Sequence, residues 1–294
     1  MPDTKWNKSF WMEDIENFNK GNSKKDLPDE THYGDRWGNT ETDNELKEII
    51  KKYIDPFIDK EKSALEIGSG GGRFTKYLQN FKTLYLVDLN PNPLDYLKKR
   101  FNLNKNFQFC LNSGNDFPGI PLNKIDYVFS HGTFVHIDLG DIIHYLCNLI
   151  PKLSNNANII LSYPEKLTKE GRLNNSFAQN SRLVIKKIRN DFGFEIQSEV
   201  VNVRNCSNVI HFTYNTKKQY FSSNKKSFEE IINFWYNKIL KRNPDNEGLK
   251  LFKNKFEQNK NSENDLIFSL LTSDEYKIQI ESYCQQIIKK FSEI

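Results

Sequence analysis

The sequence has no long hydrophobic run, few cysteines and almost no excess of charge. None of its apolar stretches approaches the ~20 residues that a membrane-spanning helix needs. The four cysteines stand far apart with no C-x-x-C pair, which argues against a zinc site or a disulfide framework. The 42 basic residues against 38 acidic ones give a net charge of +4, so a dedicated nucleic-acid-binding protein is not expected.

The few cysteines and the near-balanced charge also bear on the cellular compartment and on binding partners. The N-terminus is polar and unlike a signal peptide, and the scattered cysteines are typical of reduced thiols, so we expect a cytoplasmic protein without a transmembrane segment. Cys110 and Cys147 lie in apolar surroundings and are predicted to be core residues. The basic runs at 98–100 and 186–189 are interpreted as solvated helix faces, because no compact basic stripe appears.

Apolar strands and amphipathic helices alternate through the middle of the chain. The pattern predicts strands at 63–67, 83–88, 106–111, 125–130, 157–163, 194–204 and 208–214. It predicts helices at 44–60, 72–80, 91–101, 139–153 and 178–191, and no clear period at 164–180. Repeated strand–helix units indicate an α/β fold with a seven-stranded, mostly parallel sheet and helices on both faces.

Two segments flank this α/β domain, which we place at residues 46–222. Residues 1–45 are polar but carry aromatic side chains that could anchor the segment over a cleft: Trp6, Phe10, Trp11, Phe18, Tyr33 and Trp37. A linker is predicted at 222–226, and residues 223–294 are predicted to form a small all-helical domain. In it, Asp245 and Ser273 are placed to cap helices.

The most informative motif is the glycine loop after the strand at 63–67. It follows the pattern E-x-G-x-G-x-G, beginning at Glu66 and ending at Gly72, and the next strand ends in Asp88. A dinucleotide fingerprint would place its third glycine at position 73, which is Arg73 here. Glu66 would face a pyrophosphate badly but would suit a ligand with an ammonium and a sulfonium, while Asp88 is placed to bind ribose hydroxyls. A glycine turn without a ligand is the alternative.

This corner resembles motif I and the following acidic position of class I S-adenosylmethionine (SAM)-dependent methyltransferases. The resemblance implies a Rossmann-like fold with SAM as cofactor. It implies that a polar side chain after the third strand contacts adenine, here Asn112 or Asp116, for which an Asx turn is the alternative. The candidate cofactor-binding residues are Glu66, Gly68, Ser69, Gly70, Gly72, Asp88, Leu89, Asn112, Asp116 and Ser130.

The densest titratable cluster follows the strand at 125–130. A histidine there can take a proton from a hydroxyl near neutral pH, so His131 and His136 are the candidate catalytic bases. The alternative is that both bond to backbone groups and pack beside the cofactor. Asp138 is predicted to cap the next helix, with Asp141 at the next turn. No metal-ligand spacing stands out and no metal is predicted, although Asp138, Asp141 and Glu165 could hold a divalent ion.

Residues 33–150, from Gly34-Asp35-Arg36-Trp37-Gly38 through Phe134-Val135-His136, resemble a bacterial subgroup of these methyltransferases that is often associated with sugar or polysaccharide biosynthesis. The resemblance implies O-methylation of a sugar or glycan intermediate. The sequence departs from the subgroup after the strand at 157–163, where Ser162-Tyr163-Pro164-Glu165 stands in place of an expected histidine. Tyr163 and Glu165 either line the acceptor site or turn the chain.

Residues 228–278 resemble a small helical domain of unknown function found in bacterial proteins, some of them cell-surface or glycan-related. The matching elements are Y-x-x-I-L-x-R-x-P-D-x-x-G-L and a closing L-x-S-x-E-Y. This resemblance implies a packing or docking module that can bind a protein partner and carries no chemistry.

Other functions stay open at the level of sequence. The acceptor could be a lipid or another small metabolite, or the chain could be a SAM-binding scaffold without turnover. A nucleic-acid methyltransferase is disfavoured, because the chain reads Ser-His-Gly-Thr from position 130 where base-modifying enzymes often have an N-P-P-Y-type tetrapeptide.

Overall fold

The structure, a computed structural model, describes residues 4–21, 32–102, 104–174, 176–178, 180–192, 194–203, 207–214, 227–258 and 263–292. The predicted linker at 222–226, the proposed boundary beside it and Cys206 lie outside these ranges. Within them, no helix combines the length and the apolar character that crossing a bilayer would require.

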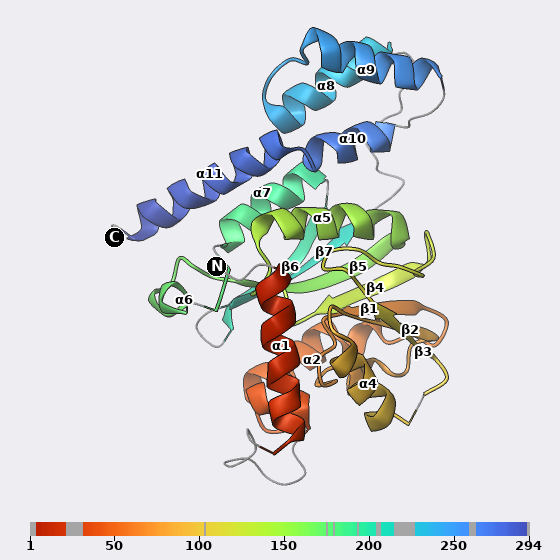
Figure 1. Ribbon diagram of the computed structural model, residues 1–294, viewed down its shortest axis with the longest axis vertical. Helices are drawn as coiled ribbons and strands as arrows, with labels where there is room; N and C mark the ends of the chain where they lie inside the picture. The colour runs from red at the N-terminus through yellow and green to blue at the C-terminus, as the bar shows by residue number, and fades with distance from the viewer. Residues whose placement is uncertain are drawn as a thin grey trace.

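A seven-stranded sheet forms the centre of the molecule (Figure 1). Its strands are β1 (Ser63–Ile67), β2 (Thr83–Asp88), β3 (Phe107–Leu111), β4 (Ile125–Ser130), β5 (Leu153–Pro164), β6 (Glu195–Val203) and β7 (Ser207–Tyr214). They lie in the order β3-β2-β1-β4-β5-β7-β6. The first five strands are parallel, and β7 runs antiparallel to both β5 and β6. This Rossmann-like, mostly parallel sheet with a reversed hairpin is the predicted fold.

Helices cover both faces of the sheet, as continuous apolar strands such as β1 require. On one face, α2 (Asn44–Tyr53) and α4 (Pro91–Arg100) share a core with the short helix α3 (Thr75–Leu78). On the other face lie α5 (Leu139–Leu149) and α7 (Arg182–Phe192) (Figure 1). The remaining short elements are α6 (Lys169–Leu173) and the 3₁₀ turns η1 (Tyr33–Trp37), η2 (Asp55–Phe57) and η3 (Ile150–Lys152).

Several predicted boundaries were wrong, and the causes are local. The helix predicted at 44–60 ends at Tyr53, because Pro56 cannot continue it and a 3₁₀ turn follows. The helix predicted at 139–153 ends at Leu149, close to Pro151, and β5 begins earlier than expected, at Leu153. The glycine loop delays α3 to Thr75, and the stretch at 164–180 contains α6.

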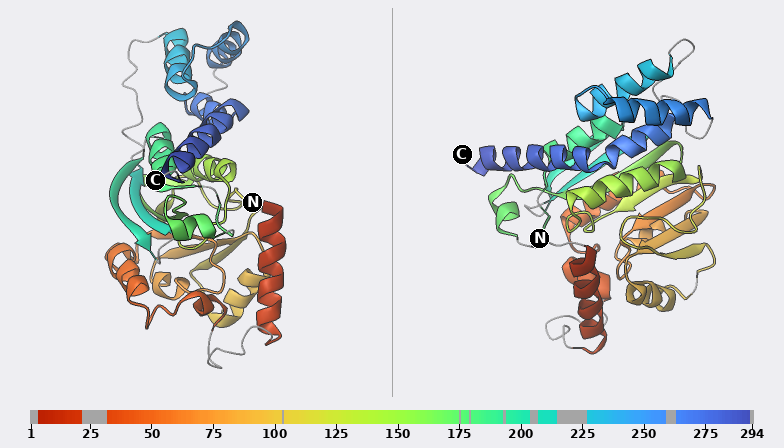
Figure 2. Two further views of the ribbon diagram at one scale, coloured as in Figure 1. Left: turned by 90° about the vertical axis from the view of Figure 1, so that its left-hand side faces the viewer. Right: turned by 45° about the horizontal axis from the view of Figure 1, so that its top comes forward.

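The C-terminal helices are stacked on the face of the sheet that α5 and α7 cover. They are α8 (Phe228–Leu240), α9 (Asn246–Glu257), α10 (Glu263–Leu271) and α11 (Asp274–Ser292). Figures 1 and 2 show α11 running across α7 and α5, and these helices share one apolar core. The fully buried Tyr276 donates a hydrogen bond of 2.8 Å to Asp191 of α7. The predicted caps are confirmed, with Asp245 accepting from Gly248 N–H and Ser273 from Tyr276 N–H.

The N-terminal segment folds into a helix, α1 (Thr4–Asn19), that packs beside α4. Ile15 and Phe18 of α1 form a small apolar cluster with Tyr33 of η1, and Tyr96 of α4 packs against it. The segment therefore depends on the α/β domain for its burial. This places its polar and aromatic residues at one edge of the sheet, where the candidate site lies.

Candidate active site

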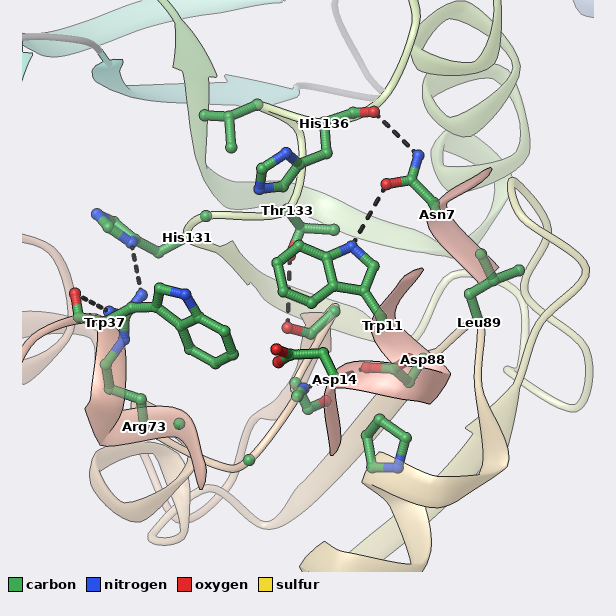
Figure 3. A pocket seen from close by; sticks show the side chains of 18 of the residues that line it. Asn7, Trp11, Asp14, Trp37, Arg73, Asp88, Leu89, His131, Thr133 and His136 are labelled. Atoms are coloured by element: carbon green, nitrogen blue, oxygen red, sulfur yellow. Dashed lines mark hydrogen bonds between the residues drawn. The ribbon is translucent and has the colours of Figure 1, made fainter. Parts of the chain in front are cut away.

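A cavity of about 970 Å³ opens beyond the carboxyl ends of β1, β2 and β4. Ligands of open α/β sheets bind at this edge, where the strand order reverses between β1 and β4. The glycine loop and the end of β2 line one part of it, and the segment 131–137 lines another. Residues of α1 and η1 line a further part (Figure 3), as do Asn174, Ser176 and Phe177.

The structure brings together most, but not all, of the residues predicted from the sequence. Those that line the cavity are Glu66, Gly68, Ser69, Gly70, Asp88, Leu89, His131 and His136. Those that do not are Gly72, Asn112, Asp116 and Ser130.

The glycine loop is shaped by its neighbours as well as by any ligand. Gly68 has φ +70°, and a Cβ there would lie 2.1 Å from Oγ1 of Thr133, so the close approach of the β4–α5 connection demands glycine. Gly70 is different, because no atom lies within 4 Å of its Cβ position. Its N–H donates a 3.1 Å hydrogen bond to Oδ2 of Asp88. The backbone at Gly70 is thus the part of the loop that is open to a ligand.

Asp88 stands at the tip of β2 with both carboxylate oxygens held by backbone groups. Oδ1 accepts from Asn90 N–H at 3.0 Å and Oδ2 from Gly70 N–H at 3.1 Å. Burial raises the pKa of Asp88 to about 6, although these backbone donors oppose the shift. The group is therefore mostly ionised at pH 7. Each oxygen keeps lone pairs for further donors, as a ribose diol would supply.

Glu66 ends β1 and is only 4% exposed. The hydroxyl of Thr75 donates to its Oε2 at 2.6 Å. Burial raises the pKa of Glu66 to about 8, against the opposing effects of Thr75 and Arg73. A buried acid of this kind holds a proton at neutral pH and gives it up when a cation binds beside it. This behaviour suits a ligand that carries an ammonium group.

The four predicted residues that do not line the cavity make contacts within the protein instead. The missing Cβ of Gly72 makes room for Leu97 and Phe101 rather than for a ligand, since a Cβ there would lie 2.7 Å from Leu97. The other three bond within the protein: Ser130 Oγ donates to Ile67 O, Asn112 Nδ2 to the Tyr145 hydroxyl, and Ser113 N–H donates to Asp116. Contact of Asn112 or Asp116 with adenine stays a prediction.

The two histidines differ in which ring nitrogen can accept a proton. Nδ1 of His136 lies 2.8 Å from the carbonyl oxygen of Ser176, so it must carry the hydrogen and Nε2 must carry the lone pair. Burial lowers the pKa of His136, which keeps the ring neutral at pH 7. In His131, by contrast, Nδ1 accepts from the Arg73 guanidinium at 3.4 Å. A neutral His131 ring therefore carries its proton on Nε2, and the geometry favours His136 as the base.

Tyr163 of β5 and Glu165, which follows this strand, were candidates for lining the acceptor site, but neither lines the cavity. Tyr163 is fully buried beside Phe134, and the carboxylate of Glu165 accepts from Leu167 N–H and from Asn208 Nδ2. Asp138 caps α5 through Asp141 N–H as predicted. In the described part of the chain, no group of three or more histidine, cysteine or acidic side chains is arranged to hold a metal ion.

The sequence analysis expected aromatic residues of the segment 1–45 to lie over a cleft, but it predicted no helix there and did not name Asn7 or Asp14. Asn7, Trp11 and Asp14 of α1 line the cavity, and Asp14 accepts from the Tyr33 hydroxyl at 2.7 Å and from Arg36 at 3.0 Å. The available signal was the spacing of Asn7, Trp11 and Asp14, which recur at three or four residues and so share one face of a helix. Their polar neighbours hid the amphipathic pattern.

Comparison with known families agrees with this geometry. A family model described as "Methyltransferase domain" matches residues 65–149, from the glycine loop through α5. The chain contains a class I SAM-dependent methyltransferase domain. The enzyme is thus a SAM-dependent methyltransferase that uses SAM as methyl donor. A second model, "Domain of unknown function (DUF4214)", matches residues 214–280 and confirms the resemblance of residues 228–278 to a small helical domain of unknown function.

Solved structures of several methyltransferases are similar in part. A SAM-dependent methyltransferase from Aquifex aeolicus has a TM-score of 0.46 and 18% identity, over 57% of this chain and 88% of its own. One from Mesorhizobium loti has a TM-score of 0.49 and 10% identity, over 59% and 99%. The N-methyltransferase NodS of Bradyrhizobium japonicum has a TM-score of 0.45 and 15% identity, over 62% and 96%. No curated protein matches the sequence significantly.

Proposed function

We propose that the methyltransferase transfers the methyl group of SAM to a hydroxyl oxygen of a sugar or glycan intermediate. The observation that carries the proposal is the state of His136, whose Nδ1–H is bound to the Ser176 carbonyl while Nε2 keeps its lone pair. A hydroxyl acceptor must lose a proton as it is methylated, and a neutral, oriented imidazole in the cavity can take it. An acceptor that has no proton to lose would not need this arrangement.

The donor half of the cavity suits SAM. Asp88 would hold the ribose hydroxyls, the open backbone at Gly70 would lie against the ligand, and Glu66 would balance the ammonium group. SAM supplies an electrophilic methyl group on a sulfonium centre. The protein's task is to place the acceptor oxygen in line with that group and to move its proton to Nε2 of His136, from which it returns to solvent.

The remaining lining favours a small, polar acceptor. The cavity volume, about 970 Å³, lies near the upper end of the range for small-molecule sites, which leaves room for an acceptor beside the cofactor. Asn7, Asp14, Asn174 and Ser176 bring polar groups to its walls. A lipid chain would call for a continuous apolar lining, and a nucleic-acid strand would need an open basic groove.

We also propose that the enzyme works in the cytoplasm. Cys110 and Cys147 are buried thiols, which fits a reducing compartment. We propose the division into an N-terminal cap at 1–45, a methyltransferase domain at 46–222 and a helical domain at 223–294. The sugar assignment also draws on the resemblance of residues 33–150 to methyltransferases of polysaccharide biosynthesis.

The test is methyl transfer from radiolabelled SAM to a panel of acceptors, with His136→Ala beside the wild type. The panel holds methyl glycosides, nucleotide sugars, fatty acids, simple phenols and RNA. We expect transfer to a sugar, and a turnover at least 100-fold lower in His136→Ala with unchanged affinity for S-adenosylhomocysteine, since general-base catalysis contributes about 10²–10⁴-fold. His144→Ala is the matched control, because His144 lies on α5 outside the cavity lining.

Two results would count against this function. Transfer to a fatty acid, a phenol or RNA, but to no sugar, would move the acceptor to another class. Equal turnover in the wild type and in His136→Ala would remove the base role, and a parallel His131→Ala variant would then show whether the other histidine carries it.

A further inference from the structure

The residues of α1 that face the cavity are tied to the segment that carries the proposed base. The indole Nε1–H of Trp11 donates to Oδ1 of Asn7 at 3.4 Å, and Nδ2 of Asn7 donates to the backbone carbonyl of His136 at 3.0 Å. Asn7 is itself 8% exposed, and one helical turn separates it from Trp11. The amide of Asn7 therefore connects the indole of Trp11 to the backbone of His136 (Figure 3).

Three rings meet around this link. The ring of Trp11 lies 5.2 Å from that of His136 at 63°, and 5.5 Å from that of Trp37 at 77°. At such angles the edge of one ring meets the face of the other, so each contact covers part of one ring face without stacking the two rings. Figure 3 shows the two indoles next to each other in the cavity, with His131 and His136 on one side of them. The indoles thus form an apolar corner beside the proposed base.

The surroundings of this corner are polar. Asp14, one turn after Trp11, is held by Tyr33 and Arg36, and the guanidinium of Arg36 lies over the ring of Trp37 at 4.7 Å. Asn174 and Ser176 line the wall near His136. Arg36 thus covers one face of Trp37, but Trp37 is still 37% exposed and Trp11 is half-buried. The corner therefore offers the remaining indole surface, surrounded by hydrogen-bonding groups. A pyranose ring has the complementary shape, since its axial C–H groups form an apolar face and its hydroxyls project from the rim.

We propose that Trp11 and Trp37 form the platform that binds the ring of the acceptor sugar, and that Asn7 is a positioning residue that aligns this platform with Nε2 of His136. This inference rests on the proposed function, because it takes the acceptor to be a sugar. It assigns acceptor recognition to α1 and η1, outside residues 65–149 that match the methyltransferase family model. The donor half and the acceptor half of the cavity thus come from different parts of the chain.

The experiment uses the full chain saturated with S-adenosylhomocysteine and methyl glycosides as probes. Saturation-transfer NMR is recorded for the methyl α-glycosides of glucose, mannose, galactose, rhamnose and fucose, with sorbitol as an open-chain polyol. We expect at least one glycoside, but not sorbitol, to show transfer to the C–H protons of one ring face. Trp11→Ala should weaken binding of that glycoside at least tenfold, Trp11→Phe should retain part of it, and Phe234→Ala, an exposed ring on α8, should leave it unchanged.

Asn7 is tested through kinetics with the same glycoside as methyl acceptor. Asn7→Leu should lower kcat more than it raises KM, because the platform persists but loses its alignment, and Asn7→Gln should recover part of kcat. A merely structural role would instead lower the midpoint of thermal unfolding without a selective loss of kcat over KM. Thermal unfolding is therefore recorded for each variant.

The outcomes separate the two proposals. If the wild type methylates a glycoside and Trp11→Ala binds it normally, the platform is wrong and the sugar function stands. If Trp11→Ala loses S-adenosylhomocysteine as strongly as it loses the glycoside, Trp11 belongs to the donor half and the platform is again wrong. If no glycoside binds or is methylated while another class of acceptor is, the proposed function fails and the platform fails with it.

Discussion

The raised pKa of Glu66 makes binding of the cofactor depend on pH in a direction that can be calculated. With a pKa of about 8, Glu66 is protonated in the ligand-free protein at neutral pH. If it faces the ammonium group of the cofactor, the complex requires the ionised form. The apparent dissociation constant then equals the intrinsic constant divided by the ionised fraction, so affinity rises as the pH approaches 8.

The size of the effect follows from the same pKa. The ionised fraction of Glu66 is about 1% at pH 6 and about 24% at pH 7.5, which predicts about 25-fold tighter binding at the higher pH. Asp88, with a pKa of about 6, adds about a factor of two over this range. The range stops at pH 7.5 because free α-amino groups begin to lose their own proton near 8.

Isothermal titration calorimetry with S-adenosylhomocysteine measures how the dissociation constant changes with pH and tests whether Glu66 causes the change. At pH 7, titrations in two buffers of different ionisation enthalpy should show the release of about one proton per ligand bound. Glu66→Gln should remove most of this release and reduce the pH dependence to the small part that Asp88 contributes. A dissociation constant in the wild type that does not change between pH 6 and 7.5 would refute the reasoning.

The raised pKa of Glu66 also makes the stability of the ligand-free protein depend on pH. The direction is opposite to that of a salt-bridged acid, whose pKa is lowered by folding. The pKa of Glu66 in the folded protein, about 8, lies above the ordinary value of 4.5, so between these two values the folded state binds the extra proton. The free energy of unfolding of the ligand-free wild type should therefore fall as the pH rises from about 4.5 to about 8, and Glu66→Gln should lack this contribution.

Two further predictions concern single hydrogen-bonding groups. Asp88→Ala should weaken binding of S-adenosylhomocysteine by about 1–3 kcal/mol, since bonds to a charged group are lost; an unchanged dissociation constant would exclude the ribose role. Tyr276→Phe should lower the free energy of unfolding by about 1–2 kcal/mol, because Asp191 loses a buried donor. Denaturant titration measures this loss, with the half-exposed pair Arg242–Glu275 as control, for which Arg242→Ala should cost less than about 1 kcal/mol.

The prediction of the fold succeeded where the signal was local. The bounds of β1, β2 and β4 agree with the strands predicted from apolar runs, and Asp138, Asp245 and Ser273 cap the helices that they precede. Such features depend on neighbouring residues, which the sequence displays directly. Helix ends were less accurate, because Pro56 and Pro151 compete with the apolar periodicity around them.

The prediction of the site was limited by distance along the chain. Glu66, Gly70 and Asp88 could be named because the glycine loop and the tip of β2 are joined by one short helix. No sequence pattern indicated that Trp11 would meet His136, 125 positions later, or that Gly72 would pack against α4 rather than a ligand. Contacts of this kind depend on how whole elements pack, which local propensity does not encode.

The sequence by itself determined the alternation of strands and helices, the glycine loop at 68–72, the acids at 66 and 88 and the presence of the helical domain, because each depends on short-range spacing. Only the tertiary structure decided which nitrogen of His136 keeps its lone pair, since that follows from the Ser176 carbonyl 40 residues away. It also decided that α11 would lie on α5 and α7, and that α1 would complete the cavity. The physical reason is that long-range burial and hydrogen bonding select among arrangements that local preferences leave equally good.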